Sequence, residues 1–279
     1  MNHKINISPS LGQLDTLTRV VDLLIGNANV RTIFEFGSRY GEDSIEFAAR
    51  YPQSAIYCFE CNPKSLTILR EKIELYSNII FKECAISDRC EIIEFFQINE
   101  AKTKTAWVDG NQGASSIFKA SGKYPLEVYH QDVIKVQAIT LNSILIQENI
   151  PEIDVMWMDI QGAELKALKG MGNKLANLKI VHLEVEFIEI YKGQPLFSKI
   201  DNFLKQNNFV FLGFTSKTHF SGDVIYLNSS HFTESQIHTA SVLMPVENKN
   251  LVFFWSKLIF RVKYFCFKCK NFVTNPFAF

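Results

Sequence analysis

The sequence predicts one doubly wound α/β unit with a mostly parallel sheet of about seven strands, spanning roughly residues 31–230. From residue 31 onward, short apolar runs alternate with segments of helical periodicity, which is typical of a parallel sheet covered on both faces. Near the end of the unit, the runs Phe209–Phe214 and Val224–Asn228 are close enough in the chain to pair as antiparallel strands. We therefore expect a sheet whose final strand is antiparallel.

The first half of this unit alternates strand and helix. Residues 11–26 precede it and have the periodicity of a leading helix. The expected elements are, in order, strand Thr32–Phe36, helix Asp43–Arg50, strand Ser54–Glu60, helix Pro63–Tyr76 and strand Asn78–Ala85. Pro63 suits the first turn of its helix, because its missing N–H would have no partner within the helix there.

A long polar segment interrupts the alternation. Two β-like runs, Glu91–Gln97 and Val133–Ile139, flank Asn99–Gln131, which contains "DGNQGASSIF". Loops of this length are usually functional or mobile, so this segment is the expected lid. The alternation then resumes with strand Ile153–Asp159, helix Ala163–Gly170, strand Lys179–Phe187 and helix Phe197–Asn207.

The chain divides into an N-terminal helical extension (1–30), the α/β domain (31–230) and a tail (231–279). The end of the tail is rich in aromatic residues and has five basic residues and no acid, namely Lys257, Arg261, Lys263, Lys268 and Lys270. Two interpretations remain open. The tail packs its apolar face on the domain, or residues 251–270 form a peripheral membrane contact.

The composition excludes several classes of protein. Hydrophobic residues make up 47% and aromatic residues 13%, which is far from a disordered composition. With 29 basic and 29 acidic residues, no global field draws the protein to nucleic acid. The start of the chain lacks the apolar core of a signal peptide, and no apolar run has spanning length. We expect a cytoplasmic protein.

Six cysteines include two CxxC pairs, Cys58 with Cys61 and Cys266 with Cys269. Zinc ribbons place such pairs about 15–20 residues apart, whereas these lie roughly 200 apart. Free, reduced thiols are therefore favoured over a structural zinc site.

A glycine turn follows the first predicted strand, in "FEFGSRYGEDS". Gly37 and Gly41 have neither the GxGxxG spacing of dinucleotide sites nor the GxxxxGK[ST] spacing of a P-loop, both of which hold phosphate. A looser turn suits a nucleoside ligand without phosphate, such as S-adenosylmethionine (SAM). Ser38 belongs to this predicted cofactor site, and Glu35 is expected near the ammonium group of the methionine part.

Two further acids follow the next strands. Glu60, in "YCFECNP", comes about 23 residues after Gly37, where an acid grips ribose hydroxyls in doubly wound folds. Cys61 follows it in the predicted site. Asp88, in "ECAISD", is expected to meet the adenine amino group, with Cys84 and Ala85 along the ring. Each acid alone is typical of a solvated loop, but carboxyl ends of parallel strands converge on one crevice.

Six blocks of the sequence together resemble the FkbM-type SAM-dependent methyltransferases: "FEFGSRYGEDS", "FECNP", "CAISD", "GASSIF", "MDIQGAELKALKGM" and "HLEVEFIEIYKGQPLFSKIDNFL". The resemblance covers about residues 31–230, and its last two blocks are far more specific than the glycine turn. It implies a class I methyltransferase (Rossmann-like) fold, SAM as the cofactor and usually O-methylation, often of sugar or polyketide hydroxyls. Glu35 stands where many methyltransferases have Asp.

Acidic residues also mark the ends of the fourth and fifth strands of the predicted sheet. Asp159 ends "DVMWMD", and Glu164 in the next helical turn favours the helix dipole. In "VHLEVEF", period-2 alternation places His182, Glu184 and Glu186 on one face. Glu184 and Glu186 would approach Asp159 across adjacent strand ends, so these three are the candidate catalytic residues.

Three roles for these carboxylates stay open. They could share a proton and serve as a general base, hold a divalent metal that lowers the pKa of an acceptor hydroxyl, or orient the substrate. No metal ligand is assigned. Tyr191, Gln194 and Pro195 follow directly and are expected to line the acceptor side.

We therefore predict a SAM-dependent methyltransferase that acts on a hydroxyl of a sugar, glycan or small natural product, without a nucleic-acid partner. One alternative is a non-catalytic SAM-binding module tethered by its basic tail. A Rossmann oxidoreductase is a weaker alternative, because the GxGxxG fingerprint is missing.

Overall fold

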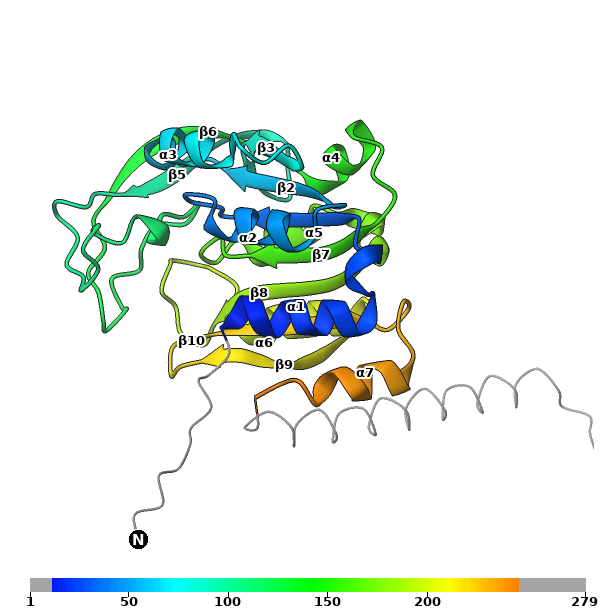
Figure 1. The fold of residues 1–279 in the computed structure, drawn as a ribbon. Coiled ribbons are helices and arrows are strands. Elements are labelled where there is room, and N and C mark those ends of the chain that lie inside the picture. The colour runs from blue at the N-terminus through cyan, green and yellow to red at the C-terminus, as the bar shows by residue number, and fades with distance from the viewer. Residues whose placement is uncertain (1–11, 246–279) are drawn as a thin grey trace, which may run out of the picture.

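A seven-stranded sheet forms the centre of the protein in the computed structural model, which describes residues 12–245 (Figure 1). The strand order is β3-β2-β1-β7-β8-β10-β9. The strands are β1 (Thr32–Phe36), β2 (Ala55–Glu60), β3 (Ile79–Glu83), β7 (Ile153–Met158), β8 (Leu178–Glu186), β9 (Phe209–Lys217) and β10 (Ser221–Asn228). All neighbours from β3 to β8 pair in parallel, and β10 pairs antiparallel with both β8 and β9. The predicted mostly parallel sheet with an antiparallel final strand is confirmed.

Helices cover both faces of this sheet. One face carries α1 (Gln13–Leu24), α2 (Glu42–Arg50), α3 (Pro63–Ile73) and α7 (Glu234–Ser241). The other face carries α4 (Leu141–Gln147), α5 (Glu164–Lys169) and α6 (Phe197–Gln206). Short 3₁₀ turns lie at η1 (Asn27–Asn29), η2 (Gln112–Ala114) and η3 (Gly172–Asn177). As the sequence indicates, Pro63 is the first residue of α3, after an Asn62 side chain that accepts a hydrogen bond from the N–H of Lys64.

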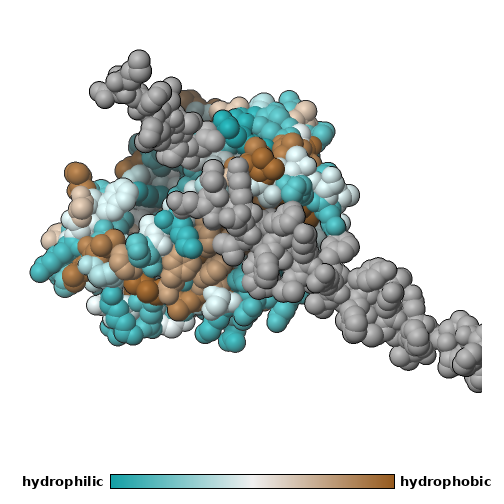
Figure 2. Space-filling model, turned by 90° about the horizontal axis from the view of Figure 1, so that it is seen from below, coloured by the Kyte–Doolittle hydropathy of each residue, from teal (hydrophilic) through white to brown (hydrophobic). Residues whose placement is uncertain are grey.

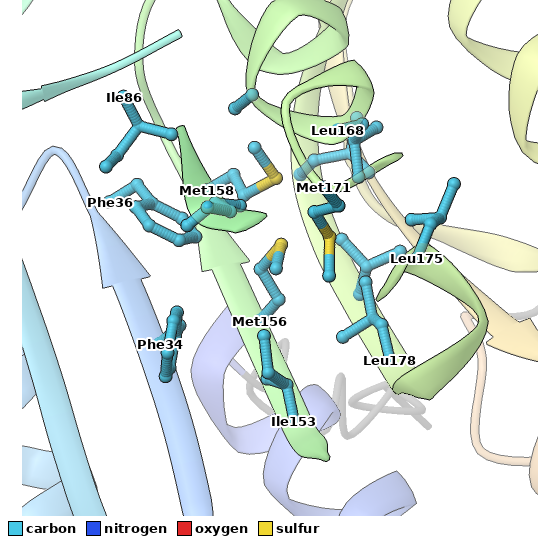
Figure 3. Close-up of a cluster of buried hydrophobic side chains, with 14 of the residues drawn as sticks. Phe34, Phe36, Ile86, Ile153, Met156, Met158, Leu168, Met171, Leu175 and Leu178 are labelled. Atoms are coloured by element: carbon cyan, nitrogen blue, oxygen red, sulfur yellow. The ribbon is translucent and has the colours of Figure 1, made fainter. Parts of the chain in front are cut away.

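The central strand β7 is buried along its whole length, as expected for a strand with helices on both sides. Its side chains alternate between two cores. Met156 and Met158 pack against the layer of α5 and η3, as Figure 3 shows, together with Phe36 and Leu168. Val155 and Trp157 pack against the layer of α1 and α2. This double burial fixes the register that places the end of β7 between its neighbours.

A second, three-stranded sheet stands beside the first, in the order β4-β6-β5. It contains β4 (Ala85–Ile86), β5 (Glu91–Ile98) and β6 (Gln131–Ile139). The sequence predicts one strand through Ala85, but the structure breaks it at Cys84, because Ala85 and Ile86 pair with β6 instead of β2. Segment 99–130 extends from this sheet, on the left in Figure 1.

The N-terminal helix and the residues after 230 share one core with the main sheet. Phe232, Ile237 and Ala240 pack in the same cluster as Leu17 and Val21 of α1. The predicted tail thus begins with a helix packed on the domain, so the boundary at residue 230 does not separate a structural unit. Residues 251–270 and the second CxxC pair lie outside the described residues.

The described surface mixes hydrophobic and hydrophilic residues, as Figure 2 shows for one face. Among residues 12–245, no helix has the length and apolar character needed to cross a membrane.

Candidate active site

A cavity of about 660 Å³ opens at the carboxyl ends of the parallel strands. It is lined by Gly37 after β1, Glu60 and Cys61 at the end of β2, Asp159 after β7 and Glu184 of β8. Segment 99–130 forms another part of its wall through residues such as Trp107, Gln112 and Tyr124. Sheets of this kind bind ligands at this edge, and the sequence predicted that acids from several strands would meet here.

The glycine turn brings the ends of β1 and β7 into direct contact. Gly37 has φ +81°, and a Cβ at this position would lie 1.9 Å from the carbonyl oxygen of Asp159. No other residue fits here. Gly41 also has φ +81° and packs against Leu69 of α3, and the Ser38 hydroxyl donates to the carbonyl of Glu35 at 3.3 Å. Gly41 and Ser38 therefore shape the turn and lie outside the cavity wall.

Glu35 also lies outside the cavity, unlike the prediction that places it beside a ligand ammonium group. Strand alternation turns its side chain toward α2, where the Ser44 hydroxyl donates a hydrogen bond to its carboxyl group. The residue is only 2% exposed. Burial, followed by the charge of Asp43, raises the pKa of Glu35 well above its ordinary value. Glu35 therefore contributes to the structure around the glycine turn through its hydrogen bonds with Ser44 and Ser38.

Glu60 reaches the cavity as a fixed hydrogen-bond acceptor. Its Oε2 accepts from the N–H of Arg39 at 2.8 Å, and its Oε1 accepts from the N–H groups of Cys61 (2.7 Å) and Asn62 (2.6 Å). Burial raises the pKa of Glu60, while these three N–H donors oppose the rise. The carboxylate is thus held in one orientation at the end of β2.

Asp88 does not reach the cavity, which corrects its predicted contact with adenine. It accepts hydrogen bonds from Lys166 Nζ at 3.0 Å and from the Ser87 hydroxyl at 3.2 Å. Desolvation alone would raise the pKa of Asp88, but the hydrogen bond and charge of Lys166 lower it below its ordinary value. Cys84 and Ala85 do line the cavity, together with Ile86.

Asp159 and Glu184 are joined by Gln161, a residue that the sequence analysis missed. Because Met158 pairs with Leu183, the residues that follow them, Asp159 and Glu184, are neighbours across β7 and β8. Gln161 Nε2 donates to Asp159 Oδ1 at 2.6 Å and to Glu184 Oε2 at 2.8 Å. All three side chains line the cavity.

The charges of this pair are coupled. Desolvation and then the charge of Asp159 raise the pKa of Glu184 well above its ordinary value. Desolvation also raises the pKa of Asp159, but the hydrogen bond from Gln161 opposes this rise. Two carboxyl groups this close oppose each other's ionisation, and because the pKa of Glu184 is the more strongly raised, Glu184 is the member of the pair that favours the protonated form.

Glu186, the third predicted catalytic residue, lies behind the cavity. It is fully buried, and neither of its carboxyl oxygens has a hydrogen-bond partner. Burial, and then the charge of Asp159, raises the pKa of Glu186 to about 8. Glu164 is equally buried, accepts from the N–H of Ile160 at 3.0 Å, and has a strongly raised pKa from burial and from the charge of Glu186. Glu164 and Glu186 are therefore buried carboxyl groups that do not line the cavity.

A second cavity of about 410 Å³ meets the first at Asp159. Asp43 of α2, Asp223 of β10 and residues at the start of α1 also line it. Burial and the charge of Asp159 raise the pKa of Asp43 to about 6 and that of Asp223 to about 7. His182 lines the same cavity, where it stacks on Trp157 at 4.1 Å. Burial lowers the pKa of His182 to about 3, so its imidazole is neutral.

Within residues 12–245, no three His, Cys, Asp or Glu side chains are arranged to hold a metal ion. Cys58 is buried in the core, whereas Cys61 lines the cavity, and both are free thiols.

The segment predicted to be a lid is fastened to the strand ends. Arg39 forms an ion pair with Asp109, and the Tyr191 hydroxyl donates to the carbonyl of Ala114 at 2.8 Å. Tyr129 stacks on Tyr191 with 6.1 Å between ring centroids. Tyr191, expected to line the acceptor side, is instead fully buried behind Tyr129, which does line the cavity.

Comparisons with known proteins identify the family of this chain. A family model described as the methyltransferase FkbM domain matches residues 28–211. The 2-O-methyltransferase NoeI of Sinorhizobium fredii is 28% identical over 170 residues, which cover 61% of this chain and 69% of NoeI.

Solved structures were also compared. TrmK of M. capricolum, in complex with S-adenosyl-homocysteine, has a TM-score of 0.39 at 12% identity and covers 79% of this chain and 72% of its own. A SAM-dependent methyltransferase from Aquifex aeolicus has a TM-score of 0.39 at 9% identity and covers 79% of this chain and 94% of its own.

The family model spans more than half of the 279 residues, and the strand order is that of the predicted class I methyltransferase fold. The chain therefore belongs to the FkbM methyltransferase domain family and is a SAM-dependent methyltransferase.

Proposed function

We propose that the enzyme transfers the methyl group of SAM to a hydroxyl oxygen of an uncharged sugar, glycan or small natural product. The observation that carries this proposal is the carboxyl pair of Asp159 and Glu184. It lies in the large cavity, between the ends of β1 and β2 and the aromatic side chains of segment 99–130.

The adenosine part of SAM fits the portion of the cavity near β2. Glu60 is a fixed carboxylate without a cationic partner among its hydrogen bonds, so it suits the two neutral hydroxyl donors of a ribose. Cys84, Ala85 and Ile86 offer an apolar wall for the adenine ring. This portion has no cradle for phosphate, in agreement with the glycine spacing.

The methionine part of SAM fits the second cavity, in place of the predicted position beside Glu35. Asp43 and Asp223 there supply negative charge for an ammonium group. The first N–H groups of α1, which follow Gly12 and receive no side-chain cap, suit the carboxylate. Because Asp159 lies where the two cavities meet, the sulfonium between the two parts of SAM would be near it.

Asp159 then serves as the general base. Methyl transfer is an in-line displacement in which the acceptor oxygen forms a bond to the methyl carbon as the bond from carbon to sulfur breaks. The hydroxyl proton passes to Asp159, and the products are a methyl ether and S-adenosylhomocysteine. Since the pKa of Asp159 is raised by desolvation, its carboxylate is a stronger base than an exposed aspartate.

The charges along the cavity favour an uncharged acceptor. Among the described residues that line it, Arg39 is the single cation, and it is already paired with Asp109. Glu127 and Asp159 would repel a phosphate group. Trp107, which is 60% exposed, and Tyr124 offer flat apolar surfaces for the C–H faces of a sugar ring. NoeI, named a 2-O-methyltransferase, supports a hydroxyl acceptor.

A panel of acceptors tests this function. Purified enzyme with methyl-labelled SAM is offered neutral glycosides, the matching sugar phosphates and nucleotide-activated sugars, and the products are separated by mass. We expect methyl ethers from neutral glycosides and at least about tenfold lower kcat/KM for each charged partner, because one uncompensated charge costs several kcal/mol near buried carboxylates. Preference for the charged sugars, or methylation only at nitrogen, would contradict the proposal.

A further inference from the structure

Gln161 occupies a backbone position that few residues adopt. Its φ is +53°, in the left-handed region, and it precedes Gly162 at φ +94°. The turn is held on both sides. The Ser116 hydroxyl donates to the carbonyl of Gln161 at 2.7 Å, and Gly162 packs against the side chain of Gln194. A non-glycine residue in this conformation is unfavourable, and such strain is found mainly where the side chain has a task.

The amide of Gln161 is anchored at its oxygen as well as at its nitrogen. The Tyr191 hydroxyl shares its one hydrogen between Gln161 Oε1 at 2.7 Å and the carbonyl oxygen of Ala114 at 2.8 Å, while Gln161 Nε2 donates to Asp159 and Glu184. Tyr191 is fully buried, and its own N–H donates to Gln194 Oε1. The chain from Gln194 through Tyr191 therefore orients the NH₂ group of Gln161 toward the carboxyl pair.

A neutral amide suits this place for an electrostatic reason. A lysine would form ion pairs with both carboxylates and abolish their shared proton, whereas a leucine would leave them without a donor. Gln161 supplies one hydrogen to each carboxyl group and adds no charge. The hydrogen bond from Gln161 to Asp159, at 2.6 Å, stabilises the ionised form of this carboxyl group.

We propose that Gln161, held by Tyr191, is a positioning residue that keeps Asp159 as the ionised member of the carboxyl pair, ready to accept the acceptor's proton. This inference rests on the proposed function of Asp159 as the base. It assigns to Gln161 and Tyr191 a role in setting the proton affinity of the site, without contact between either residue and the transferred methyl group.

Three variants test the inference through the pH dependence of kcat at saturating SAM and acceptor. Gln161→Leu removes the donors, so the midpoint of the acidic limb should rise by about one pH unit, because a hydrogen bond to a charged group is lost. Gln161→Glu should raise it at least as far, since a third carboxyl group adds repulsion. Tyr191→Phe keeps the ring but removes the hydroxyl that holds the Gln161 amide, and a smaller rise of the midpoint is expected.

Gln137→Leu is the matched control. Gln137 lies on the exposed side of β6, so this variant should leave the midpoint unchanged.

A second measurement separates this inference from the proposed function. Titration of isotope-labelled Asp159 carboxyl carbon by NMR needs no acceptor, and its midpoint should rise in Gln161→Leu relative to the wild type. If Gln161→Leu lowers kcat while both midpoints stay at the wild-type value, Gln161 is only structural and the inference is wrong. If no hydroxyl is methylated but the NMR midpoint rises, the proposed function fails and the positioning role stands.

Discussion

The buried carboxyl groups at the two ends of the cavity differ in the number of hydrogen-bond donors around them. At the end of β2, Glu60 accepts hydrogen bonds from three backbone N–H groups, so its charge is well solvated by the protein. At the ends of β7 and β8, Asp159 and Glu184 share one side-chain amide, and Glu186 behind them has no hydrogen-bond partner.

In the proposed function, this difference distinguishes the end of the cavity that binds SAM from the end that accepts the proton. A carboxylate fixed by backbone donors keeps its charge and geometry, which suits it to hold hydroxyl groups. Burial raises the pKa of carboxyl groups at both ends, but three N–H donors oppose the rise at Glu60, whereas the pKa of Glu184, which accepts from Gln161, is raised well above its ordinary value. In the proposed function, carboxyl groups therefore have two roles in one cavity, which differ with the number of hydrogen-bond donors around each group.

The largest effect on kcat should come from a change at Asp159, the proposed general base. Asp159→Asn should lower kcat by about 10²- to 10⁴-fold, because the amide cannot accept the hydroxyl proton. Glu186 lies two positions beyond Glu184 on β8 but outside the cavity. Glu186→Gln should therefore change kcat by less than about threefold, since most effects at sites that do not touch substrate are small. The measurement is kcat at saturating SAM. A loss of similar size in both variants would show that the distinction between the groups in and behind the cavity is wrong.

At the proposed recognition end, Glu60→Ala should weaken SAM binding by at least about 100-fold, because two hydrogen bonds to a charged acceptor, each about 1.5–3 kcal/mol, are lost. The variant should also be less stable, since the N–H groups of Arg39, Cys61 and Asn62 lose their acceptor. Calorimetry measures the affinity. Asp88→Ala is the control, because Asp88 pairs with Lys166 outside the cavity, and its affinity should match the wild type. Equal losses in both variants would restore Asp88 to the cofactor site.

The smallest effect concerns stability. Glu186 has a pKa of about 8 in the folded protein against an ordinary value of 4.5, so it favours folding at low pH, and this contribution is lost as the pH rises through about 8. Glu186→Gln stays neutral and should be more stable than the wild type above pH 8, by roughly 2–4 kcal/mol, with no advantage below about pH 4. Urea unfolding at several pH values measures this. Parallel stability curves for the two proteins would contradict the raised pKa.

The sequence predicted the main sheet well because each strand carries a local signal. Apolar runs of strand length, helical periodicity between them and the start of α3 at Pro63 are all readable over short windows. In the second sheet, β5 and β6 match the predicted β-like runs Glu91–Gln97 and Val133–Ile139, but β4 carries no such signal. β4 has only two residues, and it exists because Ala85 and Ile86 pair with β6, far along the chain.

The site was predictable in part for the same reason. Glu60, Asp159 and Glu184 follow from their positions at strand ends, which the fold brings together. The sequence does not show which side of β1 faces the cavity, and the prediction chose the wrong side for Glu35. Its side chain lies on the side covered by α2, where Ser44 donates to it. Asp88 was misplaced because its partner, Lys166, is distant in sequence. Gln161 has no charge or periodicity to reveal it, and only the geometry of its hydrogen bonds shows that it joins two carboxyl groups.

The three-stranded sheet gives the enzyme a modular design. It has a small core of its own, built from Ala85, Phe95, Val136 and Ala138, and it carries the segment that forms the aromatic wall of the cavity. Glu60 and Glu184, by contrast, belong to strands of the main sheet, and Asp159 directly follows one of them. Substitutions in segment 99–130 would therefore change the aromatic wall of the cavity without altering Glu60, Asp159 or Glu184.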